Sequence, residues 1–385
     1  MIPYGRQNIS ESDIESVVSV LRSDFLTQGP AVSAFETKLS EMVEARHAVA
    51  VNSATSALHI SCLALGLEVG DWLWTSPISF VASANCGAYC GANIDFVDID
   101  EISYNMCPEA LESKLVQAER EGRLPKVVVV VHLSGHAYGL HKIWALSQRY
   151  GFKVIEDASH AVGAKFEGRP VGSCVYSDIT VFSFHPVKII TTGEGGVAVT
   201  QNDQIAERLL RLRTHGITRD QGFMSGETHG PWYYEQLELG YNYRMTDIQA
   251  ALGISQLDRL EEFVRERNSL ARLYDDKLRA LPLITPVVPP SAYSARHLYV
   301  IRLKLNDISC SRKEVFESLR SLGIGVNVHY IPITRQPYYV ARGAKASDFP
   351  QSEKYYEEAI SIPLYYGLSE YDLHAVVAAL EDALS

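Results

Sequence analysis

The sequence lacks any long apolar run. Apolar residues make up 46% of the 385 residues, but stretches such as Val127–Val131 are far shorter than the roughly 20 residues that span a bilayer. The beginning, MIPYGRQNIS, has no basic segment followed by an apolar one, as a secretory signal would have. We therefore expect a cytoplasmic protein with no membrane-spanning part and with enough apolar material for a sizeable core.

Basic residues are fewer than acidic ones. The chain has 35 Lys and Arg against 46 Asp and Glu, so its formal net charge is −11. Proteins that bind nucleic acid present a basic face to the phosphates, so we expect no nucleic-acid partner. A small anionic ligand remains compatible with this charge, because a pocket can be locally positive on an acidic body.

Cysteines are few, and each stands alone in an apolar segment, as reduced core thiols of a cytosolic protein do. Two of them are four residues apart, which is a spacing that metal ligands use, but no second pair accompanies them. We expect core packing and no metal site. The six are Cys62, Cys86, Cys90, Cys107, Cys174 and Cys310.

From about residue 45 to 200, short apolar strands alternate with helical stretches. Such alternation predicts right-handed crossovers and a mainly parallel sheet, in which ligands bind beyond the carboxyl ends of the strands. The predicted strands are Ala48–Val51, Trp72–Thr75, Ile94–Val97, Val127–Val131, Lys153–Ile155, Ile179–Phe184 and Val197–Thr200.

The rest of the chain has a different pattern. Apolar residues with helical spacing predict one long amphipathic helix from Asp247 to Leu281. A strand at Leu298–Leu303, a helix near Lys313–Leu322 and the segment VNVHYIPI follow. We predict a large domain of residues 1–250, with an N-terminal arm, and a small α+β domain of residues 251–385.

Two segments in the first half follow predicted strands. NSATSAL, residues 52–58, joins a strand to a helix, and its first N–H groups could bind a phosphate; a plain Ser/Thr cap is the alternative. In VIEDASHA, residues 154–161, Asp157 ends a strand and opens a helix. Its carboxylate could pair with a protonated ring nitrogen or could cap that helix. His160 would lie near the same site or be structural.

Two further segments add to this group. In ITVFSFHPVKIITTGEGG, residues 179–196, Lys188 stands among apolar neighbours, which lower the pKa of an amine and favour the neutral form that attacks an aldehyde. A solvated surface lysine is the alternative. Ser183 could bind the phosphate, and LGYNYRMTDIQAA places Asn242 and Arg244 before a helix; a capped helix start, with Thr246 or Asp247 as cap, is the alternative. A phosphate site, an acid for a ring nitrogen and an enclosed lysine together suit pyridoxal phosphate.

Segments along nearly the whole chain resemble one family, the sugar aminotransferases of the DegT/DnrJ/EryC1/StrS group. The resemblance implies an α/β, fold-type-I architecture with a mainly parallel sheet in the large domain and a smaller α+β C-terminal domain. It also implies pyridoxal 5'-phosphate as cofactor. The matching segments are FLTQGPAVSAFE, NSATSAL, SPISFVASAN, VDID, HLSGHAYG, EDASHAVGA, SFHPVKIITTGEGG, GYNYRMTDIQAALG and VNVHYIPITRQPYY.

The resemblance also implies roles for single residues. Lys188 would form the Schiff base, Asp157 would pair with the pyridine nitrogen, and Phe80 would stack on the cofactor ring. Asn242 would reach the phosphate of the other subunit, which implies a homodimer with active sites at the interface. The remaining cofactor residues would be the Ala54 backbone, Thr55 and Ser183 at the phosphate and His160 near the cofactor hydroxyl. The family's usual NGT of the phosphate loop is SAT here.

HPVKIITT, PWYYEQLELGYNYR and GIGVNVHYIPI resemble most closely the transaminases of the pseudaminic acid pathway. That resemblance implies a UDP-linked 4-keto-6-deoxy-N-acetylhexosamine as substrate, aminated at C4, with glutamate as amino donor. The candidate substrate residues are Thr27, Gln28, His185, Arg244, His329 and Arg335. For Arg244, His329 and Arg335, a surface ion pair is the alternative.

Three other functions remain open. The enzyme could aminate another 4-keto nucleotide sugar, or be a pyridoxal-phosphate-dependent sugar dehydratase, although dehydratases of the family carry His at the position of Lys188. It could be a catalytically silent regulator on the same fold. It could also be a metal hydrolase that uses His132, His136, Asp157 and His160.

Overall fold

A seven-stranded sheet forms the centre of the protein in the computed structural model, which describes residues 1–385. The strand order is β1-β9-β8-β5-β4-β2-β3; only β9 runs antiparallel to its neighbours, so the predicted mainly parallel sheet is confirmed. The strands are β1 (His47–Val51), β2 (Trp72–Thr75), β3 (Asn93–Phe96), β4 (Val127–Val131), β5 (Lys153–Asp157), β8 (Ile179–Ser183) and β9 (Gly196–Thr200).

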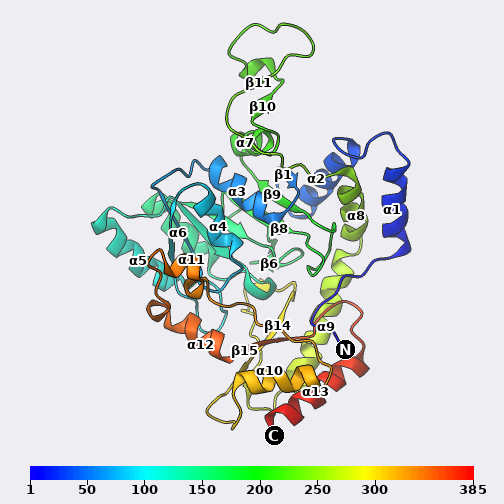
Figure 1. The fold of residues 1–385 in the computed structure, drawn as a ribbon, viewed down its shortest axis with the longest axis vertical. Helices are drawn as coiled ribbons and strands as arrows, with labels where there is room; N and C mark the ends of the chain where they lie inside the picture. Colours follow the sequence, from blue (N-terminus) through cyan, green and yellow to red (C-terminus); the bar gives the residue numbers. More distant parts are fainter.

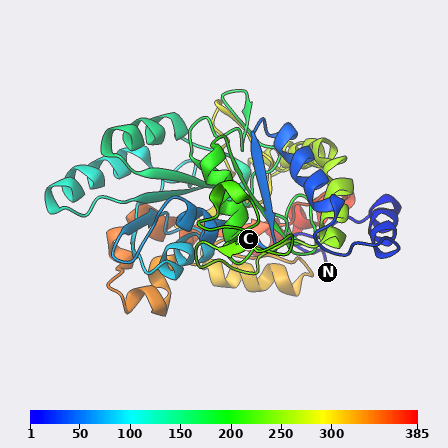
Figure 2. The ribbon, with the colours of Figure 1, turned by 90° about the horizontal axis from the view of Figure 1, so that it is seen from above.

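Helices cover both faces of this sheet (Figure 2). Successive side chains of a strand point to opposite faces, so the valines of β4 are divided: Val128 and Val130 pack under one helical layer, Val127 and Val129 under the other. One layer contains α2 (Pro30–Met42), α5 (Pro108–Glu121) and α6 (Leu140–Tyr150), and the other α3 (Ala54–Ala64), α4 (Ala82–Tyr89) and α7 (Asp203–Arg213). None of the protein's helices has both the length and the apolar character needed to cross a bilayer.

The prediction of one long helix from Asp247 to Leu281 is wrong. The structure has two helices, α8 (Asp247–Leu257) and α9 (Leu260–Lys277), separated at Asp258 and Arg259. Arg259 has non-helical backbone angles (φ −106°, ψ 3°). Helix α8 packs on α2 and on α1 (Glu11–Leu21), whereas α9 continues toward the C-terminal part of the molecule (Figure 1).

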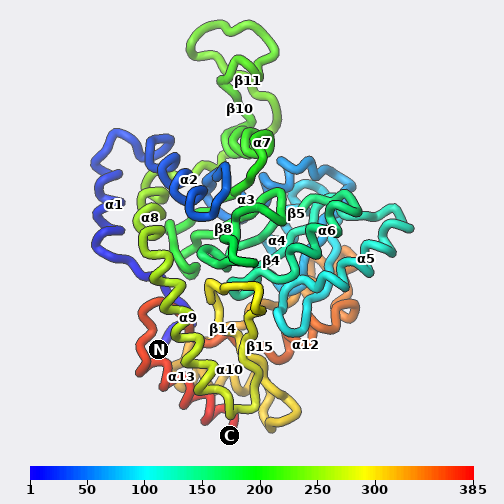
Figure 3. Tube along the Cα trace, turned by 180° about the vertical axis from the view of Figure 1, so that it is seen from behind, coloured from blue at the N-terminus to red at the C-terminus, as the bar shows by residue number.

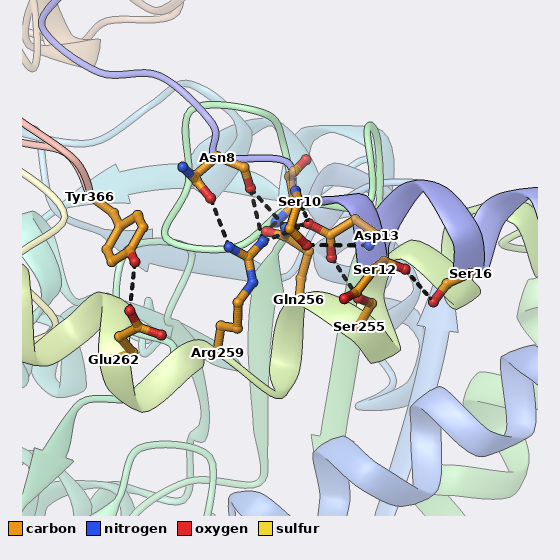
Figure 4. A network of polar contacts seen from close by, with 11 residues as sticks. Asn8, Ser10, Ser12, Asp13, Ser16, Ser255, Gln256, Arg259, Glu262 and Tyr366 are labelled. Atoms are coloured by element: carbon orange, nitrogen blue, oxygen red, sulfur yellow. Dashed lines mark hydrogen bonds and ion pairs between the residues drawn. The ribbon is translucent and has the colours of Figure 1, made fainter.

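A polar network at this break holds the N-terminal arm (Figure 4). Asp13 of α1 is fully buried and accepts hydrogen bonds from Ser255 (2.6 Å), Gln256 (2.7 Å) and Arg259 (2.6 Å). Arg259 also donates to the side chain of Asn8 at 2.7 Å. A buried carboxylate needs such partners, so the change of direction at Arg259 is coupled to docking of α1.

A second, smaller core lies in the C-terminal part. The second half of α9 packs there with a three-stranded sheet, whereas Leu260 and Phe263 of the same helix belong to the large core. The domain boundary near residue 250 therefore stays a prediction. The elements of this part are β12 (Leu283–Ile284), β14 (Tyr299–Leu303), α10 (Arg312–Ser321), α11 (Pro337–Val340), α12 (Pro350–Glu358), β15 (Ala359–Ile362) and α13 (Glu370–Leu384).

Two short sheets complete the fold. One joins β6 (Lys165–Phe166), β7 (Arg169–Pro170) and β13 (Ala292–Tyr293); the other, β10 (Ile217–Thr218) with β11 (Glu235–Gln236), belongs to a hairpin that projects from the body (Figures 1 and 3). This projecting hairpin, residues 216–240, exposes large apolar side chains, among them Trp232 and Leu239.

Candidate active site

A cavity of about 570 Å³ opens at the carboxyl edge of the large sheet, a size typical of small-molecule sites. Loops that follow β1, β2, β5 and β8 line one side of it, and residues 327–331 of the C-terminal part line the other. The cavity brings together most of the residues singled out in the sequence, namely Ala54, Thr55, Phe80, Asp157, His160, Ser183, His185, Lys188 and His329.

Lys188 lies in the loop that follows β8. Hydrogen bonds close this loop, since the N–H of Thr192 donates to the Phe184 carbonyl and the N–H of Lys188 to that of His185. Burial lowers the pKa of Lys188 to about 8, against the opposing effect of Asp157, which raises it. The shift is in the direction predicted from its apolar neighbours, so much more neutral amine is present near pH 7 than for an exposed lysine.

Asp157 ends β5 with its side chain toward the cavity and only 6% exposed. Its carboxylate accepts hydrogen bonds from the hydroxyls of Ser83 and Ser159, both at 2.6 Å. The predicted helix after Asp157 is absent: residues 158–164 form turns, because the N–H of Ser159 bonds back to the carboxylate at 3.2 Å and Gly163 has a φ of +82°. Asp157 therefore does not cap a helix.

The segment after β1 starts α3, as predicted. Ser53 is the N-cap, and its hydroxyl accepts from the N–H of Ser56 at 3.1 Å. The N–H groups of Ala54 and Thr55 belong to the first turn, which has no intrahelical acceptor for them. A Cβ atom on Gly196 would lie 2.4 Å from the Ala54 nitrogen, so only glycine lets β9 approach this turn so closely. Capping by Ser53 and an anion site at the next two residues are thus compatible.

Three buried histidines line the cavity beside Asp157 and Lys188. Burial lowers the pKa of His160, His297 and His329, that of His329 to about 3, so all three are neutral near pH 7. The rings of His160 and His297 are 4.4 Å apart between centroids. The Nδ1 of His329 lies 2.8 Å from the Ser361 hydroxyl.

Sequence reasoning missed several lining residues, among them Tyr4, His297 and Tyr330. Tyr330 stands in the quoted segment VNVHYIPI, so its position could have been proposed from that motif. His297 and Tyr4 carry no such signal. Tyr4 comes from the N-terminus, where the Leu364 N–H donates to its carbonyl, and its ring lies 5.4 Å from that of His329.

Five predicted residues do not line the cavity of their own chain: Thr27, Gln28, Asn242, Arg244 and Arg335. Arg335 forms an ion pair with Glu353, in agreement with the alternative given for it. Asn242 is exposed and pairs through its backbone with Thr214.

The four side chains of the metal-hydrolase alternative do not converge. The Nε2 of His132 lies 2.6 Å from the buried carboxylate of Glu156, and that of His136 lies 3.3 Å from the amide of Asn105. No group of three or more His, Cys, Asp or Glu side chains is arranged to hold a metal ion. The six cysteines are unpaired, and Cys62, Cys86, Cys90 and Cys174 are buried, as expected for core thiols.

The model of the DegT/DnrJ/EryC1/StrS aminotransferase family matches residues 7–381. The chain belongs to this family. Among similar members, the Bacillus subtilis spore coat polysaccharide biosynthesis protein SpsC is 37% identical over 99% of this chain and 96% of its own length. The UDP-4-amino-4,6-dideoxy-N-acetyl-beta-L-altrosamine transaminase of Campylobacter jejuni is 36% identical over 95% of this chain and 93% of its own.

Solved structures of family members have the same fold. Helicobacter pylori PseC, an aminotransferase involved in the biosynthesis of pseudoaminic acid, superposes with a TM-score of 0.90 at 29% identity, over 100% of this chain and 99% of that one. The PLP-form of the Streptococcus pneumoniae sugar aminotransferase Spr1654 gives 0.87 at 27% identity, over the full length of both chains. By its membership of this family, the present chain is a pyridoxal-phosphate-dependent sugar aminotransferase.

The cavity residues fit pyridoxal phosphate. The free first-turn N–H groups of α3, with Gly196 packed against them, suit the phosphate. The carboxylate of Asp157 is held at one place by two serine hydroxyls and could accept a further hydrogen bond from a ring N–H. The amine of Lys188 shares the cavity with this acid and can reach an aldehyde there.

Proposed function

We propose that this protein transfers an amino group from glutamate to the C4 ketone of a UDP-linked 4-keto-6-deoxy-N-acetylhexosamine. The product is a UDP-4-amino-4,6-dideoxy sugar for pseudaminic acid biosynthesis. One observation carries the transaminase chemistry: a lysine whose pKa is lowered to about 8 and a buried carboxylate line the same cavity. The similarity to the Campylobacter and Helicobacter enzymes supports the choice of sugar.

Seven cavity residues have a place in this proposal. Lys188 would hold the cofactor covalently, and its free amine would remove a proton from the donor and return one to the sugar carbon. When bound, pyridoxal phosphate acts as an electron sink. Asp157 accepts the hydrogen bond of the ring nitrogen and favours its protonated form. Phe80 would stack on the ring, His160 would lie near its hydroxyl, and Ala54, Thr55 and Ser183 would hold the phosphate.

The covalent link can be tested directly. Borohydride treatment of the yellow enzyme should attach the cofactor to Lys188, located by mass spectrometry of peptides. Lys188→Ala should abolish transamination, and Asp157→Asn should fold but lose most of its kcat. Wild-type turnover of either variant contradicts its role.

The substrate is tested separately with a panel of 4-keto nucleotide sugars and glutamate, with product configuration determined by NMR. Preferential turnover of the UDP-linked 4-keto-6-deoxy-N-acetylhexosamine to a 4-amino product supports the proposal. The panel includes other sugars because the chain is also similar to SpsC. Preference for one of them changes the substrate assignment but leaves the proposed transamination intact. A dehydrated product instead identifies a dehydratase.

We also propose that the active enzyme is a homodimer in which Asn242 contacts the phosphate bound by the partner subunit. Asn242 is exposed and absent from the cavity of its own chain, and the nearby projecting hairpin exposes Trp232 and Leu239. Large exposed apolar side chains of this kind are typical of protein interfaces. Sedimentation should give twice the chain mass.

Mixed dimers provide a sharper test of the shared site. Lys188→Ala and Asn242→Ala variants, each inactive alone, should regain activity when their subunits are mixed, because one of the two sites then has both residues. Each site of the mixed dimer combines the lysine of one chain with the asparagine of the other. No recovery in a mixed dimer of confirmed composition would show that the residues act in the same chain.

A further inference from the structure

Only one tautomer of the His160 ring agrees with its hydrogen-bond partners. The backbone N–H of Ser134 points at His160 Nδ1 at 3.3 Å. A backbone N–H can only donate, so Nδ1 must accept and carries no hydrogen. Burial keeps the pKa of His160 well below its ordinary value, so the ring is neutral and its hydrogen sits on Nε2.

The position of this donor is fixed by the loop after β4. The N–H of His297 donates to the Ser134 carbonyl at 3.0 Å, and the N–H of Ala295 to that of Gly135 at 2.8 Å. A Cβ on Gly135 would lie 2.8 Å from the His160 carbonyl oxygen, so the loop presses directly on the His160 segment. The N–H of Ser134 therefore cannot easily turn away from the ring.

The second ring nitrogen of His160 faces Tyr330. Nε2 lies 3.0 Å from the Tyr330 hydroxyl oxygen and, since Nε2 carries the hydrogen, it donates to that oxygen. Burial raises the pKa of Tyr330, so its hydroxyl stays protonated. Its own hydrogen has no acceptor among the protein groups, and Tyr330 lines the cavity with Lys188 and Asp157. The hydroxyl hydrogen of Tyr330 is therefore available to a ligand in the cavity.

We infer that Tyr330 is a catalytic residue that donates its hydroxyl hydrogen to a ligand oxygen in the cavity, and that His160 is the positioning residue that orients it. The acceptor is an oxygen with partial negative charge. It belongs to the cofactor ring hydroxyl or to a substrate carbonyl or carboxylate. This inference rests on the proposed placement of the cofactor and deepens it, because it assigns a hydrogen-bond donor that the sequence analysis did not name.

The first experiment needs no cofactor. Long-range 1H–15N NMR of the ¹⁵N-labelled, cofactor-free protein should show a neutral His160 with hydrogen on Nε2, and the resonance is assigned by its loss in His160→Gln. A ring with hydrogen on Nδ1, or a charged ring at pH 7, overturns the inference while leaving the roles of Lys188 and Asp157 unaffected.

The second experiment finds the acceptor. Tyr330→Phe removes only the hydroxyl and should lower kcat/KM by at least about tenfold, as loss of a donor to a developing charge does, whereas Tyr371→Phe on the surface should not. A matching rise in the Kd for pyridoxal phosphate identifies the cofactor oxygen. An unchanged cofactor Kd with a fall in kcat or a rise in KM identifies the substrate. No change in any of these overturns the inference.

The third experiment separates orientation from packing. Gln has both an acceptor and a donor, so His160→Gln can accept from Ser134 and donate to Tyr330, whereas His160→Leu can do neither. We expect the Gln variant to retain at least about tenfold more kcat/KM than the Leu variant. Equal losses in the two variants would show that His160 only fills space.

Discussion

The pKa of Lys188 predicts how fast the cofactor-free protein captures pyridoxal phosphate at each pH. Burial lowers this pKa from an ordinary 10.5 to about 8. At pH 7, roughly 9% of the amine is then neutral, against about 0.03% for an exposed lysine, a difference of about 300-fold. Only the neutral amine attacks an aldehyde, so the capture rate should rise about tenfold per pH unit and level off near pH 8.

The assay is stopped-flow absorbance after cofactor-free protein and pyridoxal phosphate are mixed between pH 6 and 10. Lys188→Ala should show no covalent capture, and Nα-acetyl-lysine under the same conditions should give a rate that continues to rise beyond pH 9. These two controls separate the buried amine from surface lysines and from the titration of the cofactor itself.

The structure also predicts the direction in which Asp157 changes the pKa of Lys188. Its charge raises the pKa of Lys188, so Asp157→Asn should lower that pKa further and move the levelling point to lower pH. A wild-type rate that still rises at pH 10, or a levelling point that moves upward in the Asn variant, refutes the reasoning.

Three further predictions concern other parts of the structure. Gly196→Ala places a methyl group against backbone, and overpacking of about 1–3 kcal/mol should weaken pyridoxal phosphate binding roughly 5- to 150-fold; Gly226→Ala, whose Cβ would approach no atom closer than 3.7 Å, is the control. Although burial raises the pKa of Glu156, hydrogen bonds from His132 and Ser177 lower it overall, so stability should fall as pH drops below about 4.5. When the free energy of unfolding is measured in urea at several pH values across this range, Glu156→Gln should show a weaker dependence on pH than the wild type. The same dependence on pH in both proteins contradicts this prediction. Tyr4→Ala should raise the KM of a substrate without changing the Kd for the cofactor, because Tyr4 packs on His329 at the wall opposite the phosphate loop. A higher Kd for the cofactor with an unchanged KM would contradict this prediction.

The central sheet could be predicted because its strands are buried on both faces. Trp72–Thr75 and Val127–Val131 have the predicted bounds, and every other strand of the large sheet agrees within two residues. Continuous apolar runs leave little choice of structure when both faces pack against helices. The loops at the carboxyl edge follow from this topology, and with them the positions of Asp157 and Lys188.

The errors and omissions have a common physical origin in contacts between distant residues. Arg259 leaves the helical conformation where its side chain binds Asn8 and Asp13, which no local periodicity reveals. The turn after Asp157 depends on Ser159 bonding back to the carboxylate. Tyr4 and His297 come to the cavity from segments almost 300 residues apart, so their positions depend on the fold as a whole.

The protonation states inside the cavity support two proposed roles for the amine of Lys188, namely binding of the cofactor and transfer of a proton. Among its lining residues, burial keeps the imidazoles of His160, His297 and His329 neutral and the Tyr330 hydroxyl protonated near pH 7. None of these groups can exchange a proton readily at that pH, because their pKa values are displaced far from it. Lys188, with a pKa of about 8, can both lose and regain a proton near that pH. The residue proposed to bind the cofactor is therefore also the one suited to move the proton, and the neutral histidines are suited to orient hydrogen bonds.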